Sequence, residues 1–323
     1  MLNPKFFDND VEMKSTRDGF SGGLLLAGDE NPNVVALCAD LTESVKMDAF
    51  AKKYPERFIE MGIAEQSMAS VASGMAHEGK IPFMASYAIF SPGRNWEQIR
   101  TTICYNNANV KIIGSHGGVT VGEDGGTHQA LEDIALMRVL PNMTVIVPCD
   151  AIEAKKAVLA VAKTNTPAYI RLSRTKTPII TTEETPFEIG KSEVVYRSEN
   201  AQVGIVAVGP LLYNSIIMAK HLAEEGIAVS VLNLSTIKPL DVEGLLLFAK
   251  ESGNKIVTVE EHQVAGGMGS ALAEFFAEHC PIPMEFIGVK DTFGQSGKPE
   301  ELIHYYGLDE EAIKGAVRKI LAR

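Results

Sequence analysis

Residues 34–40 read VVALCAD, a short and mostly apolar run that ends in a carboxylate. Similar runs recur along the first half of the chain, separated by longer stretches with apolar residues at three- and four-residue spacing. The predicted strands are 34–40, 80–86, 110–115, 143–148 and 167–173, and the predicted helices are 64–78, 92–106, 128–139 and 150–163. This alternation predicts βα units with a mostly parallel sheet covered by helices on both faces.

A second alternating series follows residues 176–202, a segment with threonines, prolines and glutamates that is expected to be a linker. Its predicted strands are 203–208, 228–233, 255–260 and 283–289, and its predicted helices are 211–225, 241–251, 267–279 and 309–322. The sequence therefore predicts an α/β fold with two tandem domains, residues 1–175 and 203–323, whose mostly parallel sheets are covered by helices.

Composition and charge limit which kinds of molecule the protein can bind. The chain has 323 residues, 46% of them hydrophobic, which is enough for two ordinary buried cores. Its 30 basic and 41 acidic residues give a net charge of -11. Nucleic-acid binding needs clustered Lys and Arg, so this balance argues against a nucleic-acid partner. A small phosphorylated substrate needs only a few local donors and stays possible.

The N-terminal residues MLNPKFFDNDVEMK contain no apolar stretch of signal-peptide length, and no apolar run in the chain approaches membrane-spanning length. The cysteines are scattered without a C-x-x-C spacing, at Cys38, Cys104, Cys149 and Cys280. They are expected to be small buried residues in a reducing compartment. The sequence thus predicts a cytoplasmic protein with no membrane partner and no metal site of its own.

Several polar residues follow predicted strands. In parallel α/β sheets, ligands bind beyond the carboxyl ends of the strands. Asp40, Ser86, Ser115 and Arg174 all lie at or just beyond such ends, and Glu65 follows the short run RFIEMGI. The candidate chemistry is therefore expected along one edge of the first sheet.

The stretch VGEDGGTHQ, residues 121–129, places Asp124 and His128 four residues apart in a loop that its glycines are expected to make pliable. The stretch lacks the alternating Asp and Asn ligands of a calcium loop. A histidine at its end is suited to donate or accept a proton near neutral pH.

Two further groups of residues allow a structural and a functional interpretation. Glu65, in MGIAEQSM, either stabilises a helix N-terminus or is a carboxyl group held in a dry pocket. Tyr87 and Phe90, in ASYAIFSPGR, either belong to the core or form the flat apolar wall of a site.

The glycines of AGGMGSAL, after the strand KIVTVE, resemble half of a dinucleotide fingerprint, with Glu285 roughly where a ribose-binding acid would lie. Leu272 stands where the third glycine of that pattern belongs. Close packing of a helix on a strand is the simpler interpretation, and nicotinamide binding is kept as an alternative.

The stretch MGIAEQSM with Glu65, followed later in the chain by VGEDGGTHQ with His128, resembles the C-terminal portion of a transketolase, an enzyme dependent on thiamine diphosphate. The resemblance rests on both stretches, their order and their separation. The resemblance implies a pyrimidine-binding domain followed by a transketolase C-terminal domain. It implies that Glu65 is the catalytic carboxylate on the aminopyrimidine and that Phe90 stacks on this ring with Tyr87 beside it. Asp40 matches the acid near the thiazolium ring.

The resemblance also implies a substrate channel. Asp124 and His128 match residues that contact the first hydroxyls of the donor sugar. The residues that match the binding site of the sugar phosphate are Arg17, Ser44, His116 and Arg174. Gly93 departs from the pattern, because many full-length transketolases have a third aromatic residue there, and this leaves the shape of the pyrimidine pocket open.

The chain lacks the GDG and Asn-pair pattern with which this family binds magnesium and the diphosphate. It therefore resembles the C-terminal subunit of a split transketolase, which moves a two-carbon ketol unit from a ketose phosphate to an aldose phosphate. An N-terminal subunit that binds Mg²⁺ and the diphosphate is the implied partner, in an α2β2 heterotetramer. The alternatives are the β subunit of a 2-oxo acid dehydrogenase E1 component, a 1-deoxyxylulose-5-phosphate synthase fragment and a non-catalytic partner that merely keeps the fold.

Overall fold

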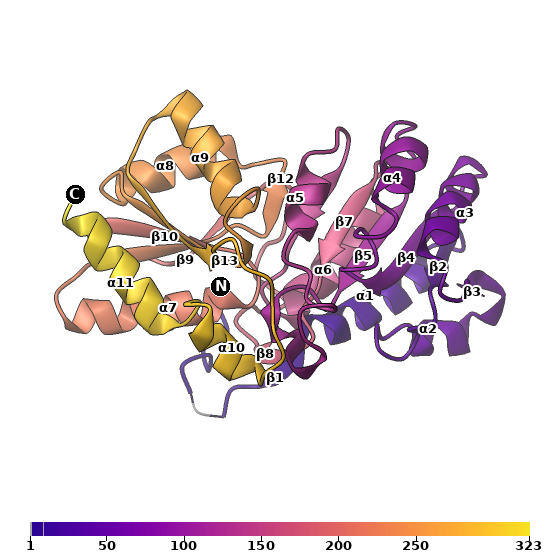
Figure 1. Cartoon of the computed structure of the whole chain (residues 1–323), viewed down its shortest axis with the longest axis horizontal. Coiled ribbons are helices and arrows are strands. Elements are labelled where there is room, and N and C mark those ends of the chain that lie inside the picture. Colours follow the sequence, from indigo (N-terminus) through magenta and orange to yellow (C-terminus); the bar gives the residue numbers. More distant parts are fainter. Residues whose placement is uncertain (1, 9) are drawn as a thin grey trace.

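A computed structural model describes residues 2–8 and 10–323, and its two large sheets lie side by side along the long axis of the molecule (Figure 1). Both sheets are mostly parallel and are flanked by helices. The predicted fold class is therefore confirmed. Among the described residues, none of the helices is both long and apolar enough to cross a membrane.

The first sheet has seven strands in the order β12-β6-β7-β5-β4-β2-β3. Every neighbouring pair is parallel except β12 and β6. The strand bounds are β2 Val34–Cys38, β3 Phe58–Glu60, β4 Ile81–Tyr87, β5 Lys111–Ser115, β6 Thr144–Ile146, β7 Ala168–Arg171 and β12 Thr236–Lys238. The central strands β2, β5 and β7 are buried at every residue, as expected for a sheet covered on both faces.

Among the described residues, the first half also contains six α-helices and three helical segments of other types. They are α1 Thr16–Glu30, α2 Asp48–Lys53, α3 Glu65–His77, α4 Trp96–Gln98, α5 Asp133–Arg138, α6 Ala151–Ala162, the 3₁₀ helices η1 Pro55–Arg57 and η3 Val119–Asp124, and the π-helix η2 Ile99–Cys104. The sequence did not predict α1, although Ser15 and Asp18 form a capping box at its start. Glycines weaken its periodic signal, and Gly23 lets α1 lie directly on α6, where an added Cβ would come 2.8 Å from Val158 Cβ.

Two predicted helices begin later than expected. The helix predicted at 128–139 starts only at Asp133, because the residues before it belong to a tightly bonded loop in which Gly118 N donates to Ala130 O. The helix predicted at 92–106 starts at Trp96 and continues as the π-helix η2.

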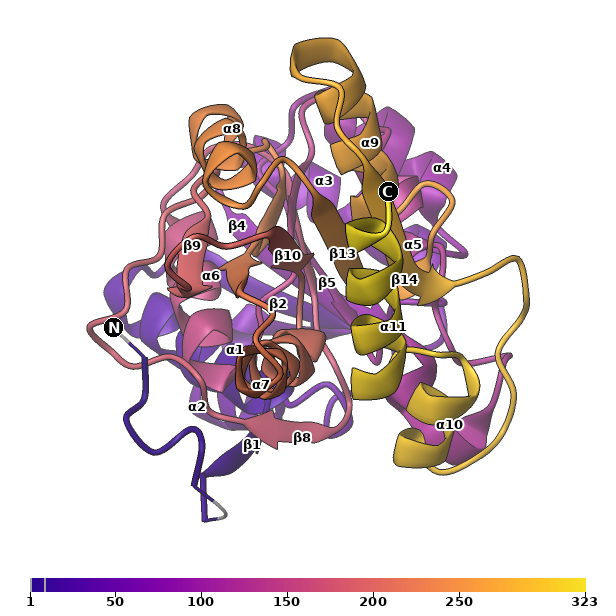
Figure 2. The ribbon, with the colours of Figure 1, turned by 90° about the vertical axis from the view of Figure 1, so that its left-hand side faces the viewer.

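The second sheet has five strands in the order β14-β13-β10-β11-β9, and only β9 is antiparallel to its neighbour. The strands are β9 Glu193–Tyr196, β10 Val203–Ala207, β11 Val229–Asn233, β13 Ile256–Gln263 and β14 Met284–Val289, and the helices are α7 Leu211–Glu224, α8 Val242–Glu251, α9 Met268–His279, α10 Pro299–Tyr305 and α11 Glu310–Leu321. Helices α7 and α11 share one apolar cluster with this sheet, whereas α8 and α9 lie over its other face (Figure 2).

The two halves are joined by more than one connection. Residues 176–202 contain β9 and also β8 Lys176–Pro178, which pairs with β1 Met13–Ser15. The strand β12 lies beyond this segment in sequence and yet extends the first sheet. One hydrophobic cluster contains residues from both sheets, such as Met84 and Leu232. The two sheets therefore form one packed unit, and the domain bounds given above stay a prediction.

Candidate active site

The edge of the first sheet at the carboxyl ends of its strands carries most of the candidate residues. Tyr87 is the last residue of β4, and His116 comes directly after β5. Arg174 follows the end of β7, and Arg17 lies in the first turn of α1, which begins beside this edge. The loops and helix starts of four separate segments therefore meet at one place.

Glu65 is the first residue of α3 and is almost fully buried, with 1% of its surface exposed. Arg94 Nη1 donates to Glu65 Oε2 at 2.6 Å, and Asn95 Nδ2 donates to the Glu65 carbonyl at 3.0 Å. No described residue donates a hydrogen bond to Glu65 Oε1. A buried carboxylate with one oxygen paired and the other free of protein donors is what a ligand-binding acid requires.

Arg94 was not predicted from the sequence, although it lies in the string SPGR. Its neighbour Gly93 departs from the family pattern, and a Cβ added there would overlap the carbonyl of Ile89. The backbone therefore leaves no room for a third aromatic side chain at this position. The Arg94 guanidinium lies 5.0 Å from the centre of the Phe90 ring, so Arg94 contacts both Glu65 and Phe90.

Tyr87 and Phe90 are half-buried at the rim, outside the sheet interior. Their rings are nearly parallel, with centres 6.0 Å apart and an interplanar angle of 10°. The His128 ring meets both edge-on, at 5.6 Å from Phe90 and 6.3 Å from Tyr87. The imidazole of His116 stacks on Tyr87 at 3.8 Å. These rings connect the surroundings of Glu65 to the loop that carries His128.

The four residues matched to the sugar phosphate lie next to one another. Arg17 Nη1 donates to the Ser44 carbonyl at 2.6 Å and lies 3.4 Å from His116 Nε2. Arg17 Nη2 donates to the Arg174 carbonyl at 2.7 Å. The Arg17 guanidinium and the His116 ring thus lie together beside the Arg174 backbone, and the Arg174 charge is near enough to lower the pKa of His116. Arginine and histidine side chains of this kind are donors that bind a phosphate.

His116 is buried and adopts the left-handed backbone conformation, with φ of 58°. Burial, and then the nearby Arg17, Arg174 and His128, lower its pKa to about 3, so the ring is neutral at physiological pH. A guanidinium can only donate, so Nε2 is the nitrogen that accepts from Arg17. The proton therefore lies on Nδ1, which donates to Ser115 Oγ at 2.8 Å.

Residues 118–129, here called the histidine loop, carry Asp124 and His128. Arg174 Nη1 donates to the Val121 carbonyl and pairs with Asp124 at 3.4 Å. Thr127 Oγ1 lies 2.9 Å from His128 Nδ1. Close contacts surround the loop glycines: an added Cβ at Gly126 would lie 2.5 Å from the Gly294 carbonyl. The pliability expected of the loop stays a prediction.

Asp40 is exposed and has a left-handed backbone, with φ of 57°. Its N–H donates to Glu60 Oε1 at 2.7 Å, and the Gly62 N–H donates to the same oxygen at 3.0 Å. Among the described residues, no hydrogen bond joins Asp40 to the other candidates. Its place after β2 nevertheless puts it on the same edge of the sheet.

The glycines of AGGMGSAL, after β13, are explained by contacts within the protein. Glu260 accepts hydrogen bonds from Met268 N at 2.7 Å and Gly269 N at 2.8 Å, so a buried carboxylate already occupies the start of α9. The carboxylate of Glu285 pairs with Lys319 and Arg323. The structure therefore favours close packing over the nicotinamide alternative.

Family comparisons agree with this arrangement. The model for "Transketolase, pyrimidine binding domain" matches residues 12–179, and that for "Transketolase, C-terminal domain" matches residues 190–313. The chain belongs to the transketolase family. Membership of this family implies thiamine diphosphate as the cofactor.

Individual relatives match nearly the whole chain. The "Putative transketolase C-terminal section" of Methanocaldococcus jannaschii is 42% identical and covers 93% of this chain and 94% of that protein. The 6-deoxy-6-sulfo-D-fructose transketolase subunit of a Clostridium species is 36% identical over 98% of both proteins. Human transketolase is 36% identical over 96% of this chain, which spans 49% of that longer protein.

Solved structures of transketolases share the same fold. One described as "Split gene transketolase, inactive beta4 tetramer" superposes with a TM-score of 0.88 and is 44% identical, covering 95% of this chain and 98% of that chain. The transketolase from Leishmania mexicana gives a TM-score of 0.84 at 25% identity, over 98% of this chain and 46% of that one. This family chain thus comprises the pyrimidine-binding and C-terminal domains of the transketolase architecture.

Proposed function

We propose that the chain is the C-terminal subunit of a two-chain transketolase, which transfers a two-carbon ketol unit from a ketose phosphate to an aldose phosphate. The observation that carries this proposal is the continuous line of groups along one sheet edge. Buried Glu65 lies at one end, the aromatic rings and His128 lie between, and Arg17, His116 and Arg174 lie at the other end. This order matches a cofactor ring, a reacting carbonyl and a terminal phosphate.

Glu65 would hold the aminopyrimidine ring of thiamine diphosphate through Oε1, the oxygen that Arg94 leaves free. Phe90 and Tyr87 would provide the apolar wall against the ring and exclude water from that hydrogen bond. When bound, thiamine diphosphate supplies the carbon nucleophile that adds to the ketose carbonyl. Arg94 would keep the Glu65 side chain oriented toward the ring.

At the other end, Arg17, Arg174 and the Ser44 hydroxyl would hold the phosphate of the sugar. His116 would take part as a neutral donor. Its proton lies on Nδ1 when Arg17 is the only partner of Nε2, and a phosphate oxygen needs the proton on Nε2 instead. The Ser115 hydroxyl can then donate to Nδ1, so the ring changes tautomer without a change in charge.

Asp124 and His128 would bind the hydroxyls near the reacting carbonyl, with His128 as proton donor or acceptor. Arg174 would connect the two ends of this channel, since it holds Asp124 and the Val121 carbonyl and would also bind the sugar phosphate. The Arg174 side chain would therefore bind the phosphate and, at the same time, hold the histidine loop in place.

The magnesium ion and the diphosphate would be bound mainly by an N-terminal subunit, in an α2β2 assembly located in the cytoplasm. Relatives of matching length named as a transketolase section or subunit support this division. The isolated chain is expected to lack activity with excess cofactor and magnesium, and addition of the N-terminal subunit should produce two-carbon transfer. Robust turnover by the chain alone would overturn the two-chain proposal.

The role of Glu65 has its own test. In the assembled enzyme, Glu65→Gln should slow hydrogen–deuterium exchange at C2 of the cofactor by about 10²–10⁴-fold, because it removes a positioned acid–base group. Glu97→Gln, an exposed change on nearby α4, serves as the matched control. Exchange at the wild-type rate in Glu65→Gln would reassign Glu65 to stabilising the start of α3.

A further inference from the structure

A buried side-chain amide, that of Gln129, bonds the histidine loop to the other half of the molecule. Gln129 is 2% exposed, and its Nε2 donates to the Val119 carbonyl at 3.0 Å and to the Gln295 carbonyl at 3.0 Å. A side-chain amide nitrogen has only two hydrogens. One therefore ties the end of the loop to its beginning, and the other ties the loop to the segment before α10.

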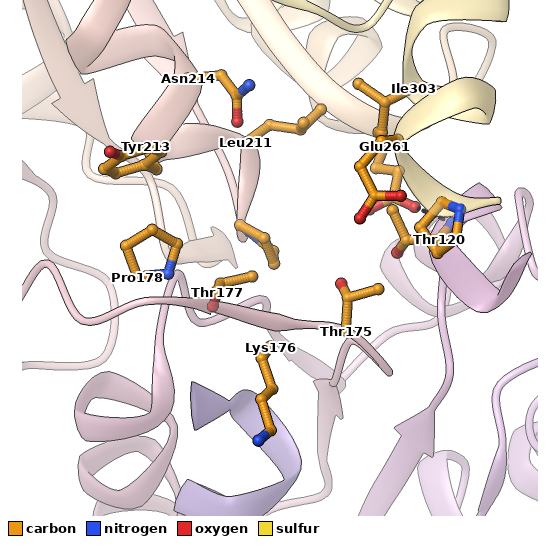
Figure 3. A pocket seen from close by; sticks show the side chains of 13 residues that line it. Thr120, Thr175, Lys176, Thr177, Pro178, Leu211, Tyr213, Asn214, Glu261 and Ile303 are labelled. Atoms are coloured by element: carbon orange, nitrogen blue, oxygen red, sulfur yellow. Dashed lines mark hydrogen bonds between the residues drawn. The ribbon is translucent and has the colours of Figure 1, made fainter. Parts of the chain in front are cut away.

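A second buried group bonds the beginning of the loop to β13. Glu261, 4% exposed, accepts the Thr120 N–H at 2.7 Å. Figure 3 shows the two side chains, from different elements, beside a cavity of about 350 Å³ between the halves of the molecule. Arg171 strengthens the connection, because its Nη2 donates both to the Glu261 carbonyl at 2.9 Å and to the Ala130 carbonyl at 3.0 Å.

Between Thr120 and Gln129, the glycines of the loop are in close contact with residues 294–299. An added Cβ at Gly125 would lie 2.5 Å from Ser296 Oγ, and one at Gly126 would lie 2.5 Å from the Gly294 carbonyl. An added Cβ at Gly122 would touch Pro299 at 3.4 Å. Residues 294–299, here called the backing segment, therefore support the part of the loop from Gly122 to Gln129, which carries Asp124 and His128.

We infer that the C-terminal domain positions the histidine loop for catalysis, through Gln129 and the backing segment and through Glu261. Gln129 is a positioning residue, because it reaches the substrate groups only through the loop. The structural part of this inference depends on the contacts above, and its catalytic part rests on the proposed function.

A pair of variants separates this role from general support of the fold. Gln129→Ala removes both amide hydrogen bonds. Gly294→Ala disturbs the same contact from the backing segment, since its Cβ would overlap Gln129 Oε1. The φ of Gly294 is not in the left-handed region, so the alanine itself causes no backbone strain. The nearest atoms to that Cβ all belong to Gln129, so Gly294→Ala should have little further effect once Gln129 is Ala.

The first measurement is amide hydrogen exchange on the whole chain, which needs neither cofactor nor partner. Each single variant should speed exchange in the histidine loop and the backing segment by about tenfold, the order expected for the loss of one or two net hydrogen bonds. The double variant should show the same exchange rates in these two segments as Gln129→Ala. Amides in α6 should exchange at the wild-type rate in every variant. Gly315→Ala, at a site open to solvent, is the control.

The second measurement uses the chain assembled with an N-terminal subunit. Both single variants should lower kcat/KM by tenfold or more for phosphorylated donors and for hydroxypyruvate, a donor without phosphate. The losses should be alike, because Asp124 and His128 of the loop would contact the part that both donors share. Activity of the wild-type mixture establishes first that the proposed function holds. If that mixture is inactive, the proposed function fails and hydrogen exchange alone decides the structural part.

Three results would overturn the inference. Unchanged exchange in the loop would show that Gln129 does not hold it. Faster exchange in α6 as well would assign Gln129 to global stability. Faster loop exchange with unaltered kcat/KM in an active assembly would remove the catalytic role.

Discussion

Replacement of the buried His116 by asparagine should make the protein less sensitive to acid. Asparagine tolerates the left-handed backbone found at this position, where φ is 58°, so the change removes the imidazole without forcing the chain to rearrange. His221→Asn, at a half-exposed position on α7, is the matched control.

The magnitude follows from the pKa shift. In the unfolded chain a histidine takes up a proton below about pH 6.5, whereas burial and two neighbouring arginines lower the pKa of folded His116 to about 3. Between these values the unfolded state binds the extra proton, so the free energy of unfolding falls as the pH decreases. Over the two pH units from 6.5 to 4.5, the loss is about 2–3 kcal/mol.

The assay is denaturant unfolding of wild type and variant between pH 8 and pH 4.5. Other buried groups also titrate: burial lowers the pKa of His262 to about 4 and raises the pKa of Glu153 and Glu260 to about 7. These groups are present in both proteins and cancel in the difference. Wild type should therefore lose about 2–3 kcal/mol more than His116→Asn over this range. Parallel curves would refute the burial and charge argument for His116.

Two other changes test the site and the packing behind it. Ser44→Ala should raise KM for phosphorylated sugars by about tenfold in the assembled enzyme and leave hydroxypyruvate unaffected. The Ser44 carbonyl still accepts from Arg17, so equal effects on both substrates would contradict a phosphate contact. Gly118→Ala should lower the free energy of unfolding by about 2 kcal/mol or more, because Gly118 has a φ of 91° and its added Cβ would overlap the Glu261 carboxylate. Stability equal to that of the wild type in chemical denaturation would show that the loop does not need this glycine.

Several features of this protein were predictable from neighbouring residues alone. Short apolar runs alternating with three- and four-residue periodicity gave the α/β class, because a strand or helix buries one face according to its local pattern. The same logic predicted one edge for Asp40, Ser86, Ser115, Arg174 and Glu65, since parallel strands end together. Helix α1 was not predicted, because the glycines that let it pack against α6 also weaken its apolar periodicity.

Contacts between distant segments were decided only by the tertiary structure. Arg94 meets Glu65 across 29 positions, Arg17 bonds the Arg174 carbonyl across 157, and Gln129 bonds Gln295 across 166. The residues 128–132 were predicted as helix and are instead held in a loop by bonds of this kind. A periodic pattern reports which face of an element is apolar and carries no information on the partner of a polar side chain. That partner is set by how the two sheets pack, because a buried donor must find an acceptor wherever the packed chain provides one.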